Sequence, residues 1–159
     1  GTGAVTKSET MQTIRDIVKS DPSAIWLTVD LGYPGTNIPA MAGADCFNTT
    51  QTYPQKERWT MLDESGEYED FYNRYCHIGA TLGSETSFEL LNTDYVNVTL
   101  SPEKFKELKI KYVVSRNSID EKIVSGTVFG ENQSSLPNGG IEFKKCYSGA
   151  ELSIYECIY

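Results

Sequence analysis

The chain has 159 residues, of which 39% are hydrophobic and 23% are charged, a composition typical of one globular domain and not of a disordered or fibrous protein. Fourteen basic residues against 22 acidic ones give a net charge of −8, which repels phosphate backbones and excludes a general nucleic-acid-binding protein. No apolar run reaches the roughly 20 residues of a membrane-spanning helix.

The chain begins with residues 1–4, GTGA, and has no initial methionine. Such a start is typical of a cleavage remnant, so we expect residues 1–5 to be a remnant or disordered and residues 6–159 to form the domain.

The first helix is predicted over residues 6–20, because a capping-box spacing at Thr6 precedes an apolar helical face. Residues 24–30 form a short apolar run that predicts a buried strand. Residues 31–57 are rich in Gly, Pro, Asn and Thr and lack periodicity. Long irregular segments of this kind often carry function.

Two sets of side chains at helical spacing predict a second helix over residues 68–77. Its aromatic face would consist of Tyr68, Phe71, Tyr72 and Tyr75. Its opposite, polar face would consist of Asp70, Asn73, Arg74 and His77. We expect the polar face to border a groove formed with residues 31–57.

The rest of the chain predicts five more strands and a third helix. The helix begins at Ser101-Pro102-Glu103, which supply a cap, a first-turn proline and an acid. The strands are residues 86–91, 95–100, 110–115, 141–147 and 152–158. We therefore expect a single α+β domain that has a mixed sheet of about five to seven strands, about three helices and a C-terminal β-hairpin.

The usual short catalytic motifs are missing, including the nucleophile elbow, the P-loop, the dinucleotide fingerprint and H-E-x-x-H. His77 is the single histidine, and on a helix its neighbour Cys76 would point about 100° away from it. Asp30, Asp45 and Asp63 are candidates for an acid and base in glycoside chemistry, although such positions arise by chance among 22 acids. We assign no catalytic residue and no cofactor.

The polar face of the second helix is a candidate binding surface for a sugar or phosphate. Arg74 and Asn73 offer fixed hydrogen-bond geometry, and Asp70 would orient Arg74. The alternative is a solvated helix face with one ion pair. Trp59 and Tyr53 would form an aromatic platform for a sugar ring, or would pack a loop. The candidate substrate-binding residues are Asn73, Arg74, His77, Trp59, Tyr53 and Asp63.

The four cysteines are Cys46, Cys76, Cys146 and Cys157, and no two of them form a C-x-x-C pair. A zinc site would need ligands from widely separated positions, so no metal site is expected. Two disulfides or four free buried thiols fit the count equally well.

Several phrases in a fixed order carry a family resemblance. They are residues 24–27 (AIWL), 37–43 (NIPAMAG), 53–54 (YP) before Trp59, 72–78 (YNRYCHI), 108–115 (LKIKYVVS) and 154–156 (IYE). Together, over residues 10–158, they resemble the C-terminal extracytoplasmic domain of large bacterial polytopic membrane proteins in the GT-C glycosyltransferase-like group. Those proteins use lipid-linked sugars to build cell-surface polysaccharides.

The resemblance implies a domain on the extracytoplasmic face of the bacterial cell membrane, preceded in the full protein by spanning helices. It would assist binding of a saccharide or lipid-linked sugar rather than catalyse transfer alone, because the catalytic acid of such enzymes lies in an early loop near the membrane. An oxidising compartment also favours disulfides. Cys46–Cys76 is the preferred pair, since a loop cysteine can approach the end of a helix.

Two alternatives from other classes stay open. One is a secreted carbohydrate-active enzyme that uses paired carboxylates such as Asp30 and Asp63. The other is a saccharide-binding or adhesion module, which Trp59, Tyr53 and the ten tyrosines favour.

Overall fold

The computed structural model describes residues 2–52, 54–131 and 136–159, and the side chains from residue 8 onward within these ranges. The helices are α1 (Thr2–Ser20), α2 (Ile38–Met41), α3 (Lys56–Leu62), α4 (Glu69–Tyr72), α5 (Pro102–Glu107) and α6 (Asp120–Ser125). The strands are β1 (Ile25–Val29), β2 (Asp45–Cys46), β3 (His77–Leu82), β4 (Ser87–Asn92), β5 (Tyr95–Leu100), β6 (Ile110–Arg116), β7 (Glu142–Ser148) and β8 (Leu152–Ile158). Short 3₁₀ helices cover Gly35–Asn37, Asn117–Ile119 and Pro137–Gly140.

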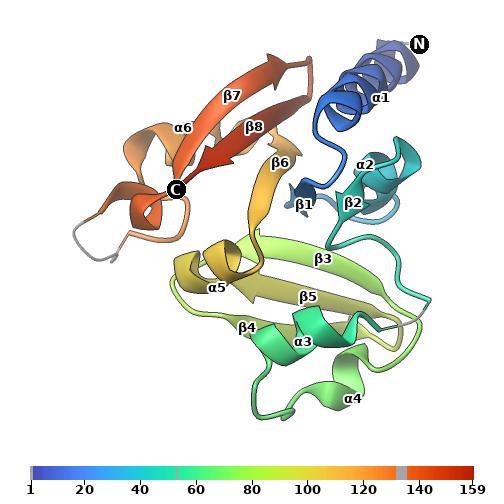
Figure 1. Cartoon of the computed structure of the whole chain (residues 1–159), viewed down its shortest axis with the longest axis vertical. Coiled ribbons are helices and arrows are strands. Elements are labelled where there is room, and N and C mark those ends of the chain that lie inside the picture. The colour runs from blue at the N-terminus through green and yellow to red at the C-terminus, as the bar shows by residue number, and fades with distance from the viewer. Residues whose placement is uncertain (1, 53, 132–135) are drawn as a thin grey trace.

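The strands form two sheets, one of five strands in the order β2-β1-β6-β8-β7 and one of three in the order β3-β5-β4 (Figure 1). In the larger sheet β1 runs parallel to β2 and β6, while β8 runs antiparallel to β6 and β7. The predicted α+β class, the mixed sheet and the C-terminal hairpin β7–β8 are confirmed. The expected single sheet is two sheets, because β5 pairs with β3 and β4 instead of joining β1 and β6.

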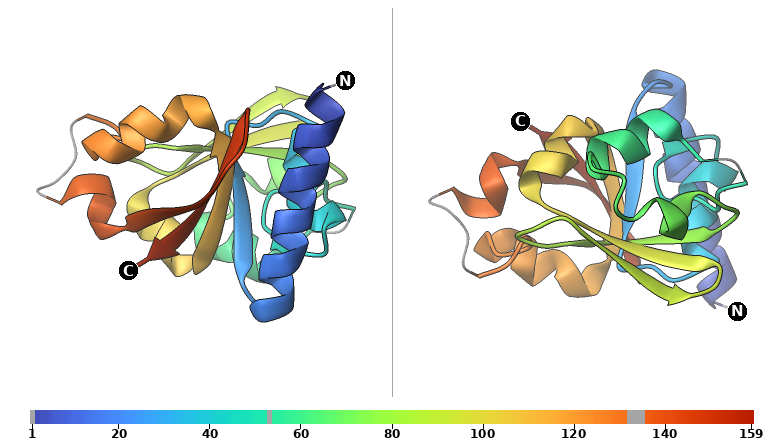
Figure 2. Two further views of the ribbon diagram at one scale, coloured as in Figure 1. Left: turned by 90° about the horizontal axis from the view of Figure 1, so that it is seen from above. Right: turned by 90° about the horizontal axis from the view of Figure 1, so that it is seen from below.

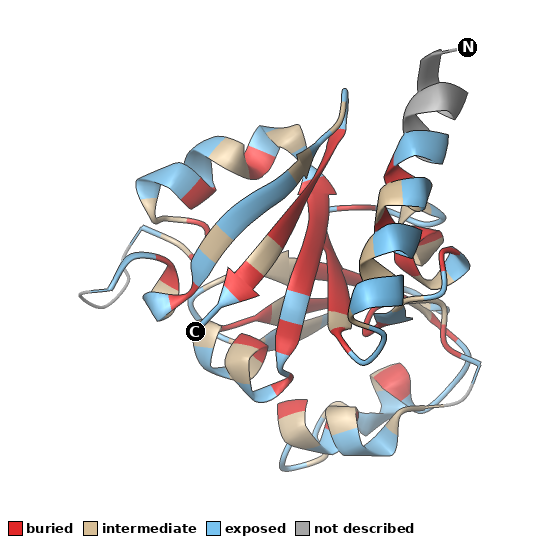
Figure 3. Cartoon of the chain, turned by 45° about the horizontal axis from the view of Figure 1, so that its top comes forward, coloured by how far each residue is buried: buried red, intermediate tan, exposed pale blue. Residues whose placement is uncertain are grey.

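Two hydrophobic clusters pack against opposite faces of the five-stranded sheet. On one face, Trp26 of β1 and Ile154 of β8 pack with Ile14 of α1. On the other face, Leu27 of β1 packs toward the inner face of the three-stranded sheet, which contributes Val96 and Val98. The successive residues Trp26 and Leu27 point to opposite faces, as expected for a strand. Figure 2 shows α1 lying along the larger sheet, and Figure 3 shows the buried central strands.

Helix α1 begins at Thr2, four residues before the start that the capping-box spacing predicted. The expected start at Thr6 was wrong, because no proline interrupts residues 2–5 and the helix continues through the capping-box sequence. The predicted apolar face is confirmed, since Ile14 is fully buried and Ile17 packs partly buried against the same cluster.

The predicted helix over residues 68–77 was wrong in its second half. α4 ends at Tyr72, and β3 begins at His77. The backbone of Cys76 exchanges two hydrogen bonds with Gln51, at 2.8 and 3.1 Å, and the His77 N–H donates to the carbonyl of Asp94 at 2.7 Å. These partners from distant segments hold the chain extended where helical spacing alone predicted a helix.

Candidate functional site

The three-stranded sheet has one covered face and one polar face. The inner face carries Val96, Val98 and Phe88, and the rings of Trp59 and Tyr72 approach Phe88 at 6.2 Å from helices α3 and α4. In Figure 1 both helices lie in front of this sheet. The opposite face, named here the outer face, is formed by the alternate residues His77, Gly79, Thr81, Ser87, Glu89, Tyr95, Asn97 and Thr99.

Three tyrosines surround His77 at one end of the outer face. The Tyr33 ring lies 3.9 Å from the imidazole, the Tyr75 ring 5.6 Å and the Tyr95 ring 6.4 Å, centroid to centroid. Tyr33 is 53% exposed and Tyr75 is 51% exposed. We call these four residues the tyrosine–histidine patch. Exposed aromatic groups beside polar ones are typical of binding surfaces.

A polar network fixes the orientation of His77. Its Nδ1 lies 2.9 Å from the hydroxyl of Thr50, which accepts a hydrogen bond from the amide of Asn37 at 3.0 Å. The side-chain Oδ1 of Asn37 in turn accepts from the Thr50 N–H at 2.8 Å. The direction of the Thr50–Nδ1 hydrogen bond depends on the imidazole tautomer, and the other ring nitrogen, Nε2, is a donor or an acceptor accordingly.

Residues 31–57 supply Tyr33, Asn37 and Thr50 to this site. His77 therefore contacts residues 31–57, and the groove expected between them stays a prediction. The predicted helical face was wrong, since Asn73 and Arg74 lie in the bend between α4 and β3. Arg74 donates to the backbone carbonyls of Asp70 and Thr93 and forms no ion pair with the Asp70 carboxylate.

A separate groove of about 330 Å³ lies between α3 and α4. Trp59, Asp63 and Asn73 all border it. Trp59 is 1% exposed, stacks on Tyr72 at 4.3 Å and donates to Gln51 at 2.8 Å, so it packs the core and is not an open platform. Its predicted partner Tyr53 lies outside the described residues.

Asp63 organises the turn after α3. Its Oδ2 accepts hydrogen bonds at 2.9 Å from the Tyr68 N–H and from the Tyr72 hydroxyl. Burial first, and then this hydrogen bond, raises the pKa of Tyr72 to about 12. The carboxylate therefore holds α4 against α3, which is a structural role.

The three aspartates considered as an acid–base pair make different contacts. Asp30 ends β1 with a φ of 56°, and burial raises its pKa although the charge of Lys122 lowers it in part. Asp45 pairs with Arg58 at 2.7 Å. With Asp63 bound to the backbone and a tyrosine, no two of these aspartates contact each other in the described part of the chain.

All four cysteines are free thiols in the structure, so the predicted Cys46–Cys76 disulfide is not formed. Cys46 belongs to the cluster beside α1 and Cys76 to the cluster between the two sheets. The body of the five-stranded sheet thus separates them. Burial raises the pKa of Cys46 to about 12 and that of Cys76 to about 11.

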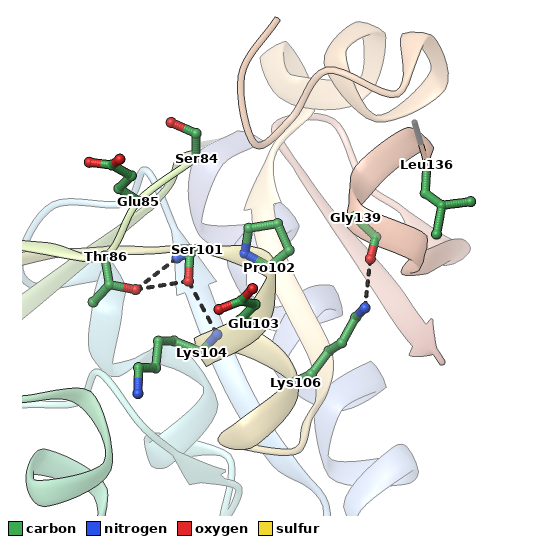
Figure 4. Close-up of a pocket in the computed structure, with 10 residues that line it drawn as sticks. All are labelled: Ser84, Glu85, Thr86, Ser101, Pro102, Glu103, Lys104, Lys106, Leu136 and Gly139. Atoms are coloured by element: carbon green, nitrogen blue, oxygen red, sulfur yellow. Dashed lines mark hydrogen bonds between the residues drawn. The ribbon is translucent and has the colours of Figure 1, made fainter. Parts of the chain in front are cut away.

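A larger cavity, of about 670 Å³, lies where the loop between β3 and β4 and the start of α5 meet the segment at Gly139 (Figure 4). Its lysines already have partners: Lys106 donates to the Gly139 carbonyl at 2.6 Å, and Lys104 to the Met61 carbonyl at 2.7 Å. Thr86 and Ser101 bond to each other at 3.0 Å. The polar groups of this cavity mainly tie α5 to its neighbours, and none of the candidate residues lines it.

Sequence reasoning missed Tyr33, Thr50 and the polar residues of β3 and β5. A signal was present in the alternation H-x-G-x-T over residues 77–81 and Y-x-N-x-T over residues 95–99, with apolar residues between. The alternation at residues 77–81 overlaps the helical spacing of residues 68–77 at His77, which favoured a helix there. No local signal joins Tyr33 or Thr50 to His77.

The fold and the outer face together define a single α+β domain with an open aromatic and polar sheet surface. The family model of a domain of unknown function, DUF7654, matches residues 4–159, and the chain belongs to this family. No curated protein and no solved structure matched the chain.

Two further observations concern the described residues alone. They contain no group of three His, Cys, Asp or Glu side chains placed to hold a metal ion. None of the helices formed by these residues is both long and apolar enough to cross a membrane.

Proposed function

We propose that the chain is an extracytoplasmic, saccharide-binding domain of a membrane protein in the GT-C glycosyltransferase-like group. It assists substrate binding in cell-surface polysaccharide assembly and does not transfer sugar by itself. The observation that carries the proposal is the pair of half-exposed rings, Tyr33 and Tyr75, packed around the oriented imidazole of His77.

The chemistry of the tyrosine–histidine patch suits a sugar. A sugar ring presents C–H groups on its faces, which pack on aromatic rings, and hydroxyls at its edge, which need donors and acceptors. Tyr33 and Tyr75 supply the rings, and the Nε2 of His77 supplies a polar group that donates or accepts according to the tautomer. By contrast Tyr72, from the same aromatic repeat, is 7% exposed and serves the core.

Two observations favour an assisting role in a membrane protein. The phrase at residues 72–78, part of the resemblance to the GT-C-like group, contributes both Tyr75 and His77 to the patch. The candidate aspartates make other contacts, which favours binding over hydrolysis by a carboxylate pair.

A glycan array tests the binding proposal. We expect the domain to bind a subset of oligosaccharides, and the double variant Tyr33→Ala/Tyr75→Ala to bind them about tenfold or more weakly, since each ring contributes about 0.5–1.5 kcal/mol. The matched control is Tyr159→Ala, which removes a ring that is also 53% exposed but contacts Phe105. Absence of binding, or equal losses in both variants, would reject the patch as a saccharide site.

The membrane context needs a second experiment. The full-length gene product should carry a long hydrophobic region before this domain, and protease added to intact spheroplasts should cleave the domain. A gene product with only a signal peptide would favour a free secreted module instead.

A further inference from the structure

The outer face continues beyond the tyrosine–histidine patch along β3 and β5. Gly79 lies opposite Asn97, and Thr81 lies opposite Thr99 in the parallel pairing. Asn97, Thr81 and Thr99 are half-buried. From Tyr95 to Thr99 the strand rises by about 13 Å, which is longer than one sugar ring. We call Gly79, Thr81, Asn97 and Thr99 the polar strip.

Gly79 lies between the tyrosine–histidine patch and Thr81 on β3, and its missing side chain leaves room for the Tyr95 ring. A Cβ at this position would lie 2.9 Å from the Tyr95 hydroxyl and 2.9 Å from the side-chain Oδ1 of Asn97. The Tyr95 ring therefore lies across the sheet over Gly79 and reaches toward Asn97. A ring that covers a glycine stabilises a sheet, and here the same ring extends an aromatic surface into a polar one.

The polar strip keeps hydrogen-bonding capacity for a partner. The hydroxyls of Thr81 and Thr99 bond to each other at 2.7 Å, and the Asn97 amide donates to Thr81 at 3.4 Å. Each hydroxyl has one proton and two lone pairs, so these two hydrogen bonds leave the pair with one proton and two lone pairs. Hydroxyl and amide groups are suited to hydrogen bonds with sugar hydroxyls.

The charge of the three-stranded sheet selects against an acidic ligand. The eighteen residues HIGATL, SFELLN and YVNVTL of β3, β4 and β5 include no lysine and no arginine, and Glu89 on the edge strand is their single acid. The nearby guanidinium of Arg74 is bound to two backbone carbonyls. In a chain with a net charge of −8, these strands offer an anionic saccharide no lysine and no arginine.

We propose that the polar strip and the tyrosine–histidine patch together bind an extended, neutral oligosaccharide that runs along β3 and β5. One ring packs on Tyr33 and Tyr75, and the following rings hydrogen-bond to Asn97, Thr81 and Thr99. This inference deepens the proposed function and rests on it.

The test measures the affinity of the native domain and of one double variant for saccharides that differ in length and charge. Thr81→Val/Thr99→Val keeps the shape and the strand preference of both side chains and removes both hydroxyls. The probes are the neutral oligosaccharide that binds best on the array, its shortest binding fragment, and its uronic-acid counterpart. The matched control is Thr60→Val, which makes the same change in the α3–α4 groove.

We expect the double variant to bind the long neutral probe about tenfold more weakly, as two lost hydrogen bonds imply, and the shortest fragment unchanged. Thr60→Val should change neither affinity, and the uronic-acid probe should bind the native domain more weakly than the neutral one. Thermal melting of each variant controls for folding.

The outcomes separate this inference from the proposed function. If Tyr33→Ala/Tyr75→Ala abolishes binding while the threonine double variant binds every probe normally, the patch is a saccharide site and the extended strip is rejected. Tighter binding of the uronic-acid probe would overturn the neutral ligand. If the native domain binds no saccharide, both proposals fail.

Discussion

The side-chain amide of Asn48 pairs with the backbone of Thr28 as a neighbouring strand would. Its Oδ1 accepts from the Thr28 N–H at 2.8 Å, and its Nδ2 donates to the Thr28 carbonyl at 2.7 Å. Both residues are fully buried. β2 contains only Asp45–Cys46, so the amide continues the edge of the sheet where the backbone of β2 has ended.

Asn48→Ala should therefore destabilise the domain severely. It leaves a buried N–H and a buried carbonyl of Thr28 unsatisfied, at about 1–3 kcal/mol for each group, so we expect the free energy of unfolding to fall by at least about 2 kcal/mol. Urea denaturation followed by circular dichroism measures this. Asn73→Ala, at an exposed bend, is the control and should stay within about 0.5 kcal/mol of the native protein. A loss below 1 kcal/mol in Asn48→Ala would contradict the structural role of the amide.

Substitution at Gly139 should be far more costly than at Gly32. Gly139 has a φ of +62°, and a Cβ there would lie 2.3 Å from the Cβ of Pro102, whereas nothing lies within 4 Å of a Cβ at Gly32. Gly139→Ala combines a left-handed backbone with overpacking, and we expect a loss of about 2–5 kcal/mol. Gly32→Ala should leave the melting temperature unchanged or slightly raised. Similar melting temperatures for the two variants would show that the contact with Pro102 is not maintained.

The cysteines should titrate as four thiols when the protein is denatured without reductant. In the native state Cys146, the exposed cysteine, should be alkylated first, because the reagent cannot reach the buried Cys46, Cys76 and Cys157. Burial raises the pKa of all four thiols, so exposure and not the direction of the pKa shift sets this order. Iodoacetamide labelling followed by peptide mass spectrometry identifies the modified residues. Fewer than four thiols in protein isolated without reductant would show that a disulfide forms, as the sequence predicted, and would contradict the four free thiols of the structure.

The domain should lose stability in alkaline solution through Tyr72. Burial, followed by the hydrogen bond to Asp63, raises the pKa of Tyr72 from its ordinary value of 10.0 to about 12. Between these values the unfolded chain releases the proton and the folded chain keeps it, so the contribution is complete below pH 10 and is lost as the pH rises toward 12.

Tyr72→Phe tests that linkage directly. The variant should be less stable near neutral pH, by about 1–3 kcal/mol, because the buried Asp63 carboxylate loses a donor. Its stability should also fall less steeply between pH 10 and 12 than that of the native protein. Urea denaturation at a series of pH values gives both quantities, and equal slopes in the two proteins would refute the assignment to Tyr72.

The sequence by itself determined the elements whose patterns are local. Residues 25–29 are a strand because a short apolar run bounded by turn residues is suited to burial on both faces of a sheet. The apolar residues of α1 recur with the helical period, so they lie on one face, which packs against the sheet. The hairpin of β7 and β8 follows from two alternating runs close in the chain. The single histidine also identified one member of the site before its surroundings were known.

Only the tertiary structure decided where α4 ends and what surrounds His77. Residues 68–77 satisfy helical spacing, yet Gln51 and Asp94 pair with the backbone of Cys76 and His77 and make that part extended. Tyr33 and Thr50 contact His77 from a segment that lies far from it in the chain. These contacts form only when long loops close, and the local spacing of residues does not predict that closure. Because β5 pairs with β3 and β4, the strands form two sheets instead of the one expected. Alternate residues of β3 and β5 therefore form the outer face of the smaller sheet.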